Sequence, residues 1–169
     1  MYILDTNIFI ASARMYYAFD LVPGFWDVLL DRAEKKEIGS IDRVMEELQR
    51  GNENDAVRLW AEKQRADAKF EFASTRTKPV LAVYKKVIQW ADDNPQYTRD
   101  AKNEFAKDDI ADAWLIAYAK VYDGMTVVTN EKEDPKIRRK ILIPNICKEF
   151  GVSYMDQFEM MRKLGMHLG

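Results

Sequence analysis

The sequence predicts an α/β fold built around a mainly parallel central sheet. Short apolar stretches rich in β-branched residues alternate along the chain with longer stretches whose apolar residues follow a helical period. Apolar residues make up 47% of the 169 residues and charged residues 32%, which is an ordinary composition for a globular domain with a core. Strands that alternate with helices in this way are typical of helices packed on a parallel sheet.

Three short stretches are predicted to be the main strands, namely residues 2–5, 125–131 and 152–156. The stretch MTVVTNE at 125–131 is the most convincing because it holds four consecutive β-branched residues. Residues 38–41 predict a further, very short strand. The stretch FEFAS at 70–74 is ambiguous between strand and loop.

Apolar residues at helical spacing, together with Pro or Asn near the starts and Gly near the ends, predict the helices. The predicted helices cover residues 23–37, 42–51, 54–66, 78–94, 99–107, 108–123, 145–151 and 157–165. Asn54 is the expected N-cap of the third of these helices. We expect one domain over residues 1–169, with a helical insertion at about 54–97.

The composition excludes several kinds of chemistry. The chain has one cysteine, Cys147, and one histidine, His167, which we expect to be a core residue and a tail residue. Mechanisms that need a positioned imidazole, and zinc sites that need several His or Cys ligands, are therefore disfavoured. If the protein is an enzyme, carboxylates must do most of its chemistry.

The charge and the hydropathy pattern narrow the class of protein further. The net charge of −2 and the pI of about 5.6 argue against a simple basic nucleic-acid binder, but not against a nuclease whose positive charge comes from a metal ion. No stretch approaches the length of a membrane span, and the N-terminus does not have the pattern of a signal peptide. We therefore expect a cytoplasmic protein.

Acidic residues follow two of the predicted strands. Asp5 ends the first strand, and Glu131 ends the stretch at 125–131, with Asp134 as a reserve candidate. Ligands of parallel α/β sheets bind at the carboxyl ends of the strands, so these positions suit a site. The alternatives are that Asp5 only caps the next helix and that Glu131 belongs to a polar loop.

Two further acids border apolar helix faces. Glu47 lies beside the buried face of the helix at 42–51, and Asp112 lies near the start of the helix at 108–123. Asp112 would share a helix face with Asp108 and Asp109 and is flanked by apolar residues, which is a poor setting for a solvated acid. A solvated face for Glu47 and dipole-stabilised acids at 108 and 109 remain the simpler interpretations.

Carboxylates gathered in one place repel one another, and their pKa values rise unless a positive charge lies between them. A divalent cation can supply that charge. Oxygen ligands suit Mg²⁺ or Mn²⁺ better than zinc, and one or two such ions can activate water and polarise a phosphodiester. The four acids therefore predict a magnesium or manganese site.

Four segments resemble the PIN domain, the nuclease fold of many VapC-type toxins, and they occur in the family's order. They are LDTNIFI (4–10), SIDRVMEEL (40–48), DAWLIAYA (112–119) and VVTNE (127–131). The first and third are fairly specific in combination, whereas the second is weak alone. The sequence is more closely similar to a poorly characterised PIN-like subgroup, through YYAFDLVPGFW (16–26) and IPNICKEFGV (143–152).

The resemblance implies a three-layer α/β/α sandwich with a parallel sheet of four or five strands. It also implies a ribonuclease in which Asp5, Glu47 and Asp112 hold the metal and Glu131 assists. Asn7 and Thr129 would orient the ligands or the attacking water. Glu131 stands where most members have Asp, so the fourth ligand is either Glu131 or Asp134.

The family implies an RNA substrate and a cognate antitoxin protein encoded beside the toxin, and its members are often homodimers. The candidates for holding the RNA backbone are basic residues of one helix and of one late loop, which could equally be ordinary solvated surface. These residues are Lys85, Lys86, Arg138, Arg139 and Lys140.

A different function remains open, because a PIN-like domain that has lost its activity could serve as a nucleic-acid or protein binding module. Two other carboxylate classes fit less well. A phosphatase of the haloacid dehalogenase type needs a second acid where this chain has Asn7. A two-component receiver places its phosphoacceptor after a later strand.

Overall fold

The computed structural model describes residues 1–168, so Gly169, the last residue of the predicted domain, lies outside the described part. Five parallel strands form one sheet in the order β3-β2-β1-β4-β5. The strands are β1 (Tyr2–Leu4), β2 (Ile38–Ile41), β3 (Phe72–Ala73), β4 (Thr126–Val128) and β5 (Ser153–Met155). The predicted α/β class with a mainly parallel sheet is therefore confirmed.

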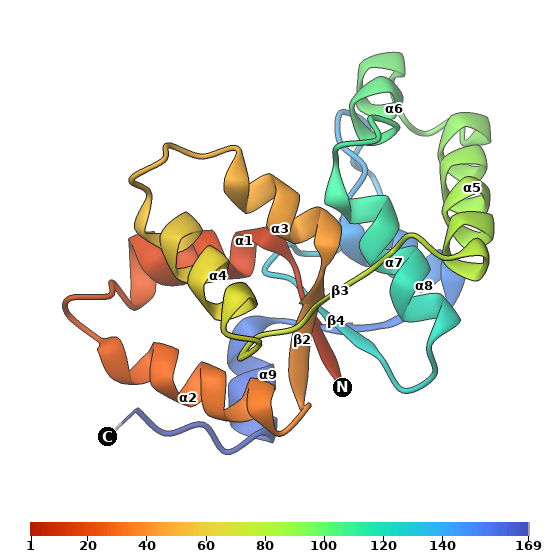
Figure 1. The fold of residues 1–169 in the computed structure, drawn as a ribbon. Helices are drawn as coiled ribbons and strands as arrows, with labels where there is room; N and C mark the ends of the chain where they lie inside the picture. Colours follow the sequence, from red (N-terminus) through yellow and green to blue (C-terminus); the bar gives the residue numbers. More distant parts are fainter. Residues whose placement is uncertain (169) are drawn as a thin grey trace.

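Helices flank the sheet on both sides, so the sandwich has three layers (Figure 1). One side carries α1 (Thr6–Ala11), α2 (Pro23–Glu34), α4 (Ala56–Ala66) and α9 (Gln157–Lys163). The other side carries α5 (Lys78–Asp93), α6 (Arg99–Phe105), α7 (Ala111–Val121) and α8 (Ile143–Phe150). Helix α3 (Asp42–Gln49) contacts helices of both groups, and a π-helical turn (Ser12–Tyr16) continues α1.

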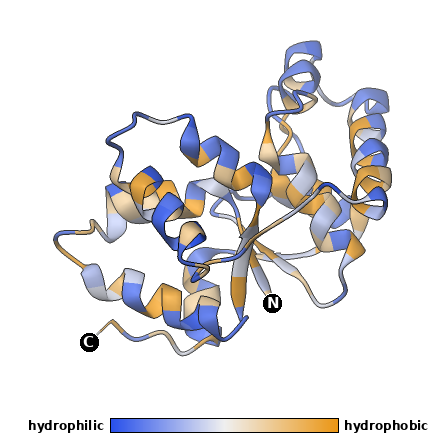
Figure 2. Cartoon of the chain, viewed as in Figure 1, coloured by the Kyte–Doolittle hydropathy of each residue, from blue (hydrophilic) through white to orange (hydrophobic). Residues whose placement is uncertain are grey.

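The core lies on both faces of the sheet, because the central strands β1, β2 and β4 are largely buried, as expected for a parallel sheet. Helix α7 is mostly buried, with seven of its eleven residues in the core. A cluster of aromatic rings, centred on Phe9 with Trp60, Phe70 and Phe72 around it, fills the space beside β2 and β3. Figure 2 shows hydrophobic residues along the strands, and hydrophilic residues around α6 and in the loop between α3 and α4.

Local signals explain where most helices begin and end. Thr77 is the N-cap of helix α5, and its hydroxyl accepts a hydrogen bond from the Val80 N–H. Pro79 lies in the first turn of the same helix. Helix α8 ends at Gly151, whose φ of 62° lies in the left-handed region that glycine adopts freely. The N-cap of α4 is Asp55 rather than Asn54, because the Asp55 carboxylate accepts from the N–H groups of Val57 and Arg58.

One predicted boundary differs in a way that matters for the site. The helix expected from residue 108 begins only at Ala111, so Asp108 and Asp109 do not share a helix face with Asp112. Instead Arg43 and Arg50 pair with the carboxylates of Asp108 and Asp109, which are exposed. The ambiguous stretch at 70–74 contains β3, which pairs with β2. No helix in residues 1–168 is long and apolar enough to cross a membrane.

Candidate metal centre

The carboxyl ends of the two central strands lie next to each other. Leu4 of β1 pairs with Val128 of β4, and the Asp5 N–H donates to the Val128 carbonyl at 3.0 Å. The residues that follow each strand, Asp5 in one case and Thr129 in the other, therefore leave the sheet at the same edge. This register places Asp5 beside the segment after β4, which contains Glu131.

Asp5 is the N-cap residue of α1, but its side chain makes no capping hydrogen bond to that helix. Its Oδ2 instead accepts a hydrogen bond of 3.1 Å from the Thr129 hydroxyl, across the two strand ends. Asp5 is only 2% exposed. The geometry therefore does not support a simple capping role, since the carboxylate accepts a hydrogen bond from Thr129 at the neighbouring strand end.

Glu47 reaches the same edge from α3 and is held there by two donors. Its Oε1 accepts a hydrogen bond of 2.8 Å from the Ala111 N–H, which is the first residue of α7, and its Oε2 accepts from the Thr6 hydroxyl. Glu47 thus binds the N-terminus of the helix whose second residue is Asp112. Thr6 is a site residue that sequence reasoning missed, although it lies between Asp5 and Asn7 in the opening motif.

Glu131 approaches from the loop after β4, and protein donors occupy both of its carboxylate oxygens. Its Oε2 accepts from the Ile143 N–H at 2.8 Å, at the start of α8. Its Oε1 pairs with the ammonium group of Lys140. The Thr129 hydroxyl also accepts a hydrogen bond from the Glu131 N–H, which connects this loop to Asp5.

Electrostatics show that the four carboxyl groups act on one another. The pKa of Asp5 is raised to about 7, chiefly by burial and further by the charges of Glu131 and Glu47, while hydrogen bonds from Thr129 and from the Thr6 backbone oppose the rise. Burial likewise raises the pKa of Asp112 well above its usual value, with Asp5, Glu131 and Glu47 adding to the rise. Lys140 opposes the rise at Asp112. Asp5, Glu47, Asp112 and Glu131 are called the acid group below.

The acid group combines oxygen ligands, burial and mutual repulsion, which suit a hard divalent cation. Within residues 1–168, however, no three Asp, Glu, His or Cys side chains are already arranged so that they could hold one ion. The oxygens of the two glutamates accept instead from the donors of Thr6, Ala111, Lys140 and Ile143. Coordination of one ion by three of these side chains would therefore require the side chains to shift.

The supporting candidates separate into two kinds. Thr129 is buried and contacts Asp5 directly, whereas Asn7 is exposed on α1 and makes no side-chain hydrogen bond to the described residues. Asp134 is exposed, and its carboxylate accepts from the Lys136 N–H in its own loop. The charges that act on Asp5 and Asp112 include Glu131 but not Asp134.

The five basic candidates also differ in their distance from the acid group. Arg139 and Lys140 line a small cavity together with Asp112, so they border the acids. Arg138 donates to the Gln96 carbonyl at 3.3 Å. Lys85 and Lys86 are exposed on α5, the helix that packs against α7. Contact between any of these residues and RNA stays a prediction.

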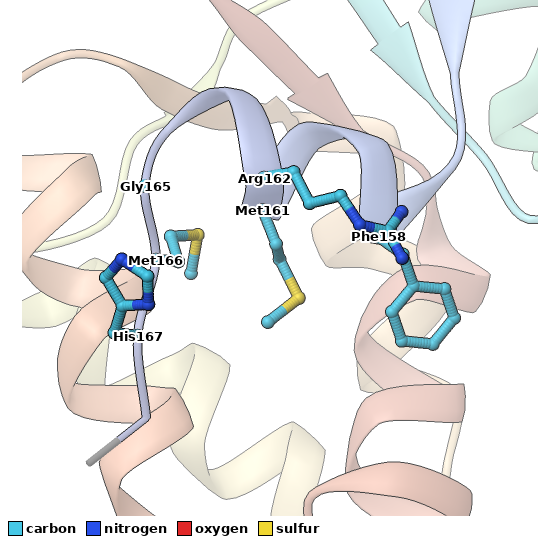
Figure 3. Close-up of a pocket in the computed structure, with 6 residues that line it drawn as sticks. All are labelled: Phe158, Met161, Arg162, Gly165, Met166 and His167. Carbon is cyan, nitrogen blue, oxygen red and sulfur yellow. The ribbon is translucent and has the colours of Figure 1, made fainter.

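A second cavity lies far from these residues, between α9 and the end of the chain (Figure 3). Its lining consists of Phe158, Met161, Arg162, Gly165, Met166 and His167. The lining contains none of the predicted site residues and no carboxylate. His167 is exposed there. This cavity therefore adds nothing to the acid group.

Replacing Thr129 by Val should weaken Mn²⁺ binding by about tenfold to a hundredfold, because residues that orient a metal ligand typically contribute that much. Val keeps the shape and the β-propensity but removes the hydroxyl that donates to Asp5. Calorimetric titration with Mn²⁺ measures the change. Thr126→Val, at the other end of β4, is the matched control, and equal affinities in the two variants would contradict the role of Thr129.

The five-stranded parallel sheet with helices on both sides, and the acids near the ends of β1 and β4, define the chain as an α/β domain with a PIN-like fold. A solved structure supports this class, namely VapBC2 from Rickettsia felis bound to a DNA fragment from their promoter. The two chains match with a TM-score of 0.51 and 15% sequence identity, over 92% of this chain and 97% of the other. This likeness is one of fold alone.

The family model that matches residues 2–168 is described as a domain of unknown function, DUF4411, and the chain belongs to this family. No curated protein matches the sequence. The resemblance to a poorly characterised PIN-like group, which rested on the motifs of the sequence, is confirmed by these two findings together.

Proposed function

We propose that the protein is a metal-dependent endoribonuclease that hydrolyses RNA phosphodiester bonds and acts as the toxin of a toxin–antitoxin pair. The observation that carries the proposal is the convergence of Asp5, Glu47, Asp112 and Glu131, from four separate segments, at one edge of the sheet. Bringing these negative charges together costs free energy. A bound cation would offset this repulsion and would also attract an anionic substrate, and strained charge clusters of this kind are typical of functional sites.

The acid group would hold one or two Mg²⁺ or Mn²⁺ ions. Its donors are all oxygens, and its most buried members, Asp5 and Asp112, have raised pKa values because burial and neighbouring carboxylates disfavour their charged forms. When bound, the metal would supply a Lewis acid that activates water for attack on phosphorus.

The residues of the chain would position the reaction. Thr129 holds the Asp5 carboxylate, and the Thr6 hydroxyl and the Ala111 N–H hold the Glu47 carboxylate. Asn7, which is exposed beside Asp5, would orient the attacking water. Water rather than a side chain is the nucleophile in this proposal, so the expected products carry 5′-phosphate and 3′-hydroxyl ends.

Basic residues next to the acid group would hold the RNA backbone. Arg139 and Lys140 are the nearest, since they share a cavity with Asp112. Arg138, Lys85 and Lys86 would extend the contact to phosphates farther along the strand. The resulting affinity should fall as salt rises, because the binding of phosphates by lysine and arginine releases counterions.

The toxin part of the proposal draws on the likeness to VapBC2. That solved structure is bound to a promoter DNA fragment. By analogy with a VapBC pair, this chain would bind a cognate antitoxin. Two copies of the chain would form a homodimer in the cytoplasm. The apolar residues Met15 and Leu21, which are 74% and 77% exposed, are available for such contacts.

Incubation of the purified protein with total RNA, in the presence of Mg²⁺, Mn²⁺ or EDTA, tests the proposal. We expect cleavage with either metal, no cleavage with EDTA, and no cleavage of duplex DNA. Calorimetric titration with Mn²⁺ in the same buffers separates the nuclease from the binding module. The absence of both metal binding and cleavage would establish the binding module as the better interpretation.

A further inference from the structure

Lys140 contacts the acid group as an internal cation. Its ammonium group pairs with Glu131 Oε1, and the Lys140 side chain lines the cavity that also contains Asp112. Lys140 therefore places a positive charge beside two of the four acids.

The two oxygens of Glu131 have different partners. Oε2 accepts from the backbone N–H of Ile143, which the first turn of α8 holds in place. Oε1 is held only by the flexible side chain of Lys140, which is 54% exposed. Withdrawal of Lys140 into solvent would free Oε1 for a new ligand while Ile143 kept the carboxylate oriented.

We propose that Lys140 is a displaceable counter-cation, which offsets part of the negative charge of the acid group when no metal is bound and which a divalent ion would displace from Glu131 by charge repulsion. This inference rests on the proposed function, since it takes the acid group to be a metal site. It gives Lys140 a second role besides the RNA contact suggested by the sequence. Metal affinity is then set by a competition between Lys140 and the ion.

Replacement of Lys140 by Met should tighten Mn²⁺ binding by about tenfold or more, because the ion no longer competes with a tethered ammonium group. Met keeps much of the unbranched aliphatic stem and removes the charge. The same variant should unfold at a lower temperature than the wild type in EDTA, since the acids lose their counter-cation. Calorimetric titration and thermal unfolding at pH 8 provide the two readouts, neither of which needs RNA.

Two control variants separate competition from a general effect of charge. Lys136→Met removes the same charge from an exposed residue of the same loop and should change neither readout appreciably. Lys140→Arg keeps a cation that can hold a carboxylate through two donors, so it should bind Mn²⁺ no more tightly than the wild type. The arginine variant also serves if Lys140→Met does not fold.

The outcomes distinguish this inference from the proposed function. Tighter Mn²⁺ binding by Lys140→Met, with no cleavage of RNA by the wild type or the variant, would support the counter-cation and contradict the nuclease. Cleavage by the wild type, with equal Mn²⁺ affinities in the wild type and Lys140→Met, would overturn the counter-cation alone. Failure of every variant to bind Mn²⁺ would overturn both.

Discussion

Replacement of Asp112 by Asn is expected to abolish Mn²⁺-dependent RNA cleavage, with a loss of roughly 10³-fold or about 4 kcal/mol of transition-state stabilisation. Asn has the same shape as Asp but lacks the negative charge that Asp112 would contribute to metal binding. Folding should survive, because the substitution removes a buried charge that burial and three neighbouring carboxylates destabilise. Rates of cleavage at saturating Mn²⁺, with a circular dichroism spectrum of each variant, measure the effect.

The matched control is Asp108→Asn, which makes the same chemical change four residues earlier in the chain. Asp108 is 75% exposed, pairs with Arg43 and precedes the first turn of α7, so its loss should leave cleavage within about twofold of the wild type. Asp5→Asn should behave like Asp112→Asn. Undiminished cleavage in both the Asp5 and Asp112 variants would remove the acid group from the mechanism.

Without divalent ions, the protein is expected to be more stable at pH 5 than at pH 8. The folded chain raises the pKa of Asp5 from 3.8 to about 7, so between these values the folded state binds a proton that the unfolded state has released. Folding therefore loses stability as the pH rises through this window. A shift of this size corresponds to at most about 4 kcal/mol at pH 8, and Asp112 acts in the same direction.

Urea unfolding in EDTA at pH 5 and pH 8 measures this slope, and Asp5→Asn is the informative variant. Because Asn cannot ionise, Asp5→Asn should unfold at higher urea than the wild type at pH 8, and its stability should depend less on pH. Asp134→Asn changes an exposed carboxylate outside the acid group and should leave the slope unchanged. Mn²⁺ should restore stability to the wild type at pH 8 and not to Asp5→Asn. A wild-type stability that rose with pH would contradict the account.

Much of the fold is readable in the sequence because the signals are local. The β-branched residues of β4, the apolar faces of α5 and α7 and the Pro and Gly residues at helix ends predict their elements within a few residues. The start of α7 was misplaced because the chain at 108–110 is held by Arg43 and Arg50, which come from α3 and its C-cap. Such contacts join residues that are far apart in the sequence, so no periodic pattern of residues predicts them.

The candidate site divides in the same way. The sequence by itself determined the class of fold, pointed away from thiol and imidazole mechanisms, and singled out the four acids as candidates, since these follow from composition and from motif spacing. Only the tertiary structure decided that Glu47 holds the N-terminus of α7, that Thr129 rather than α1 takes the Asp5 carboxylate, and that Lys140 pairs with Glu131. The physical reason is that a hydrogen bond or an ion pair depends on the relative positions of two backbones, which the packing of helices on the sheet alone establishes.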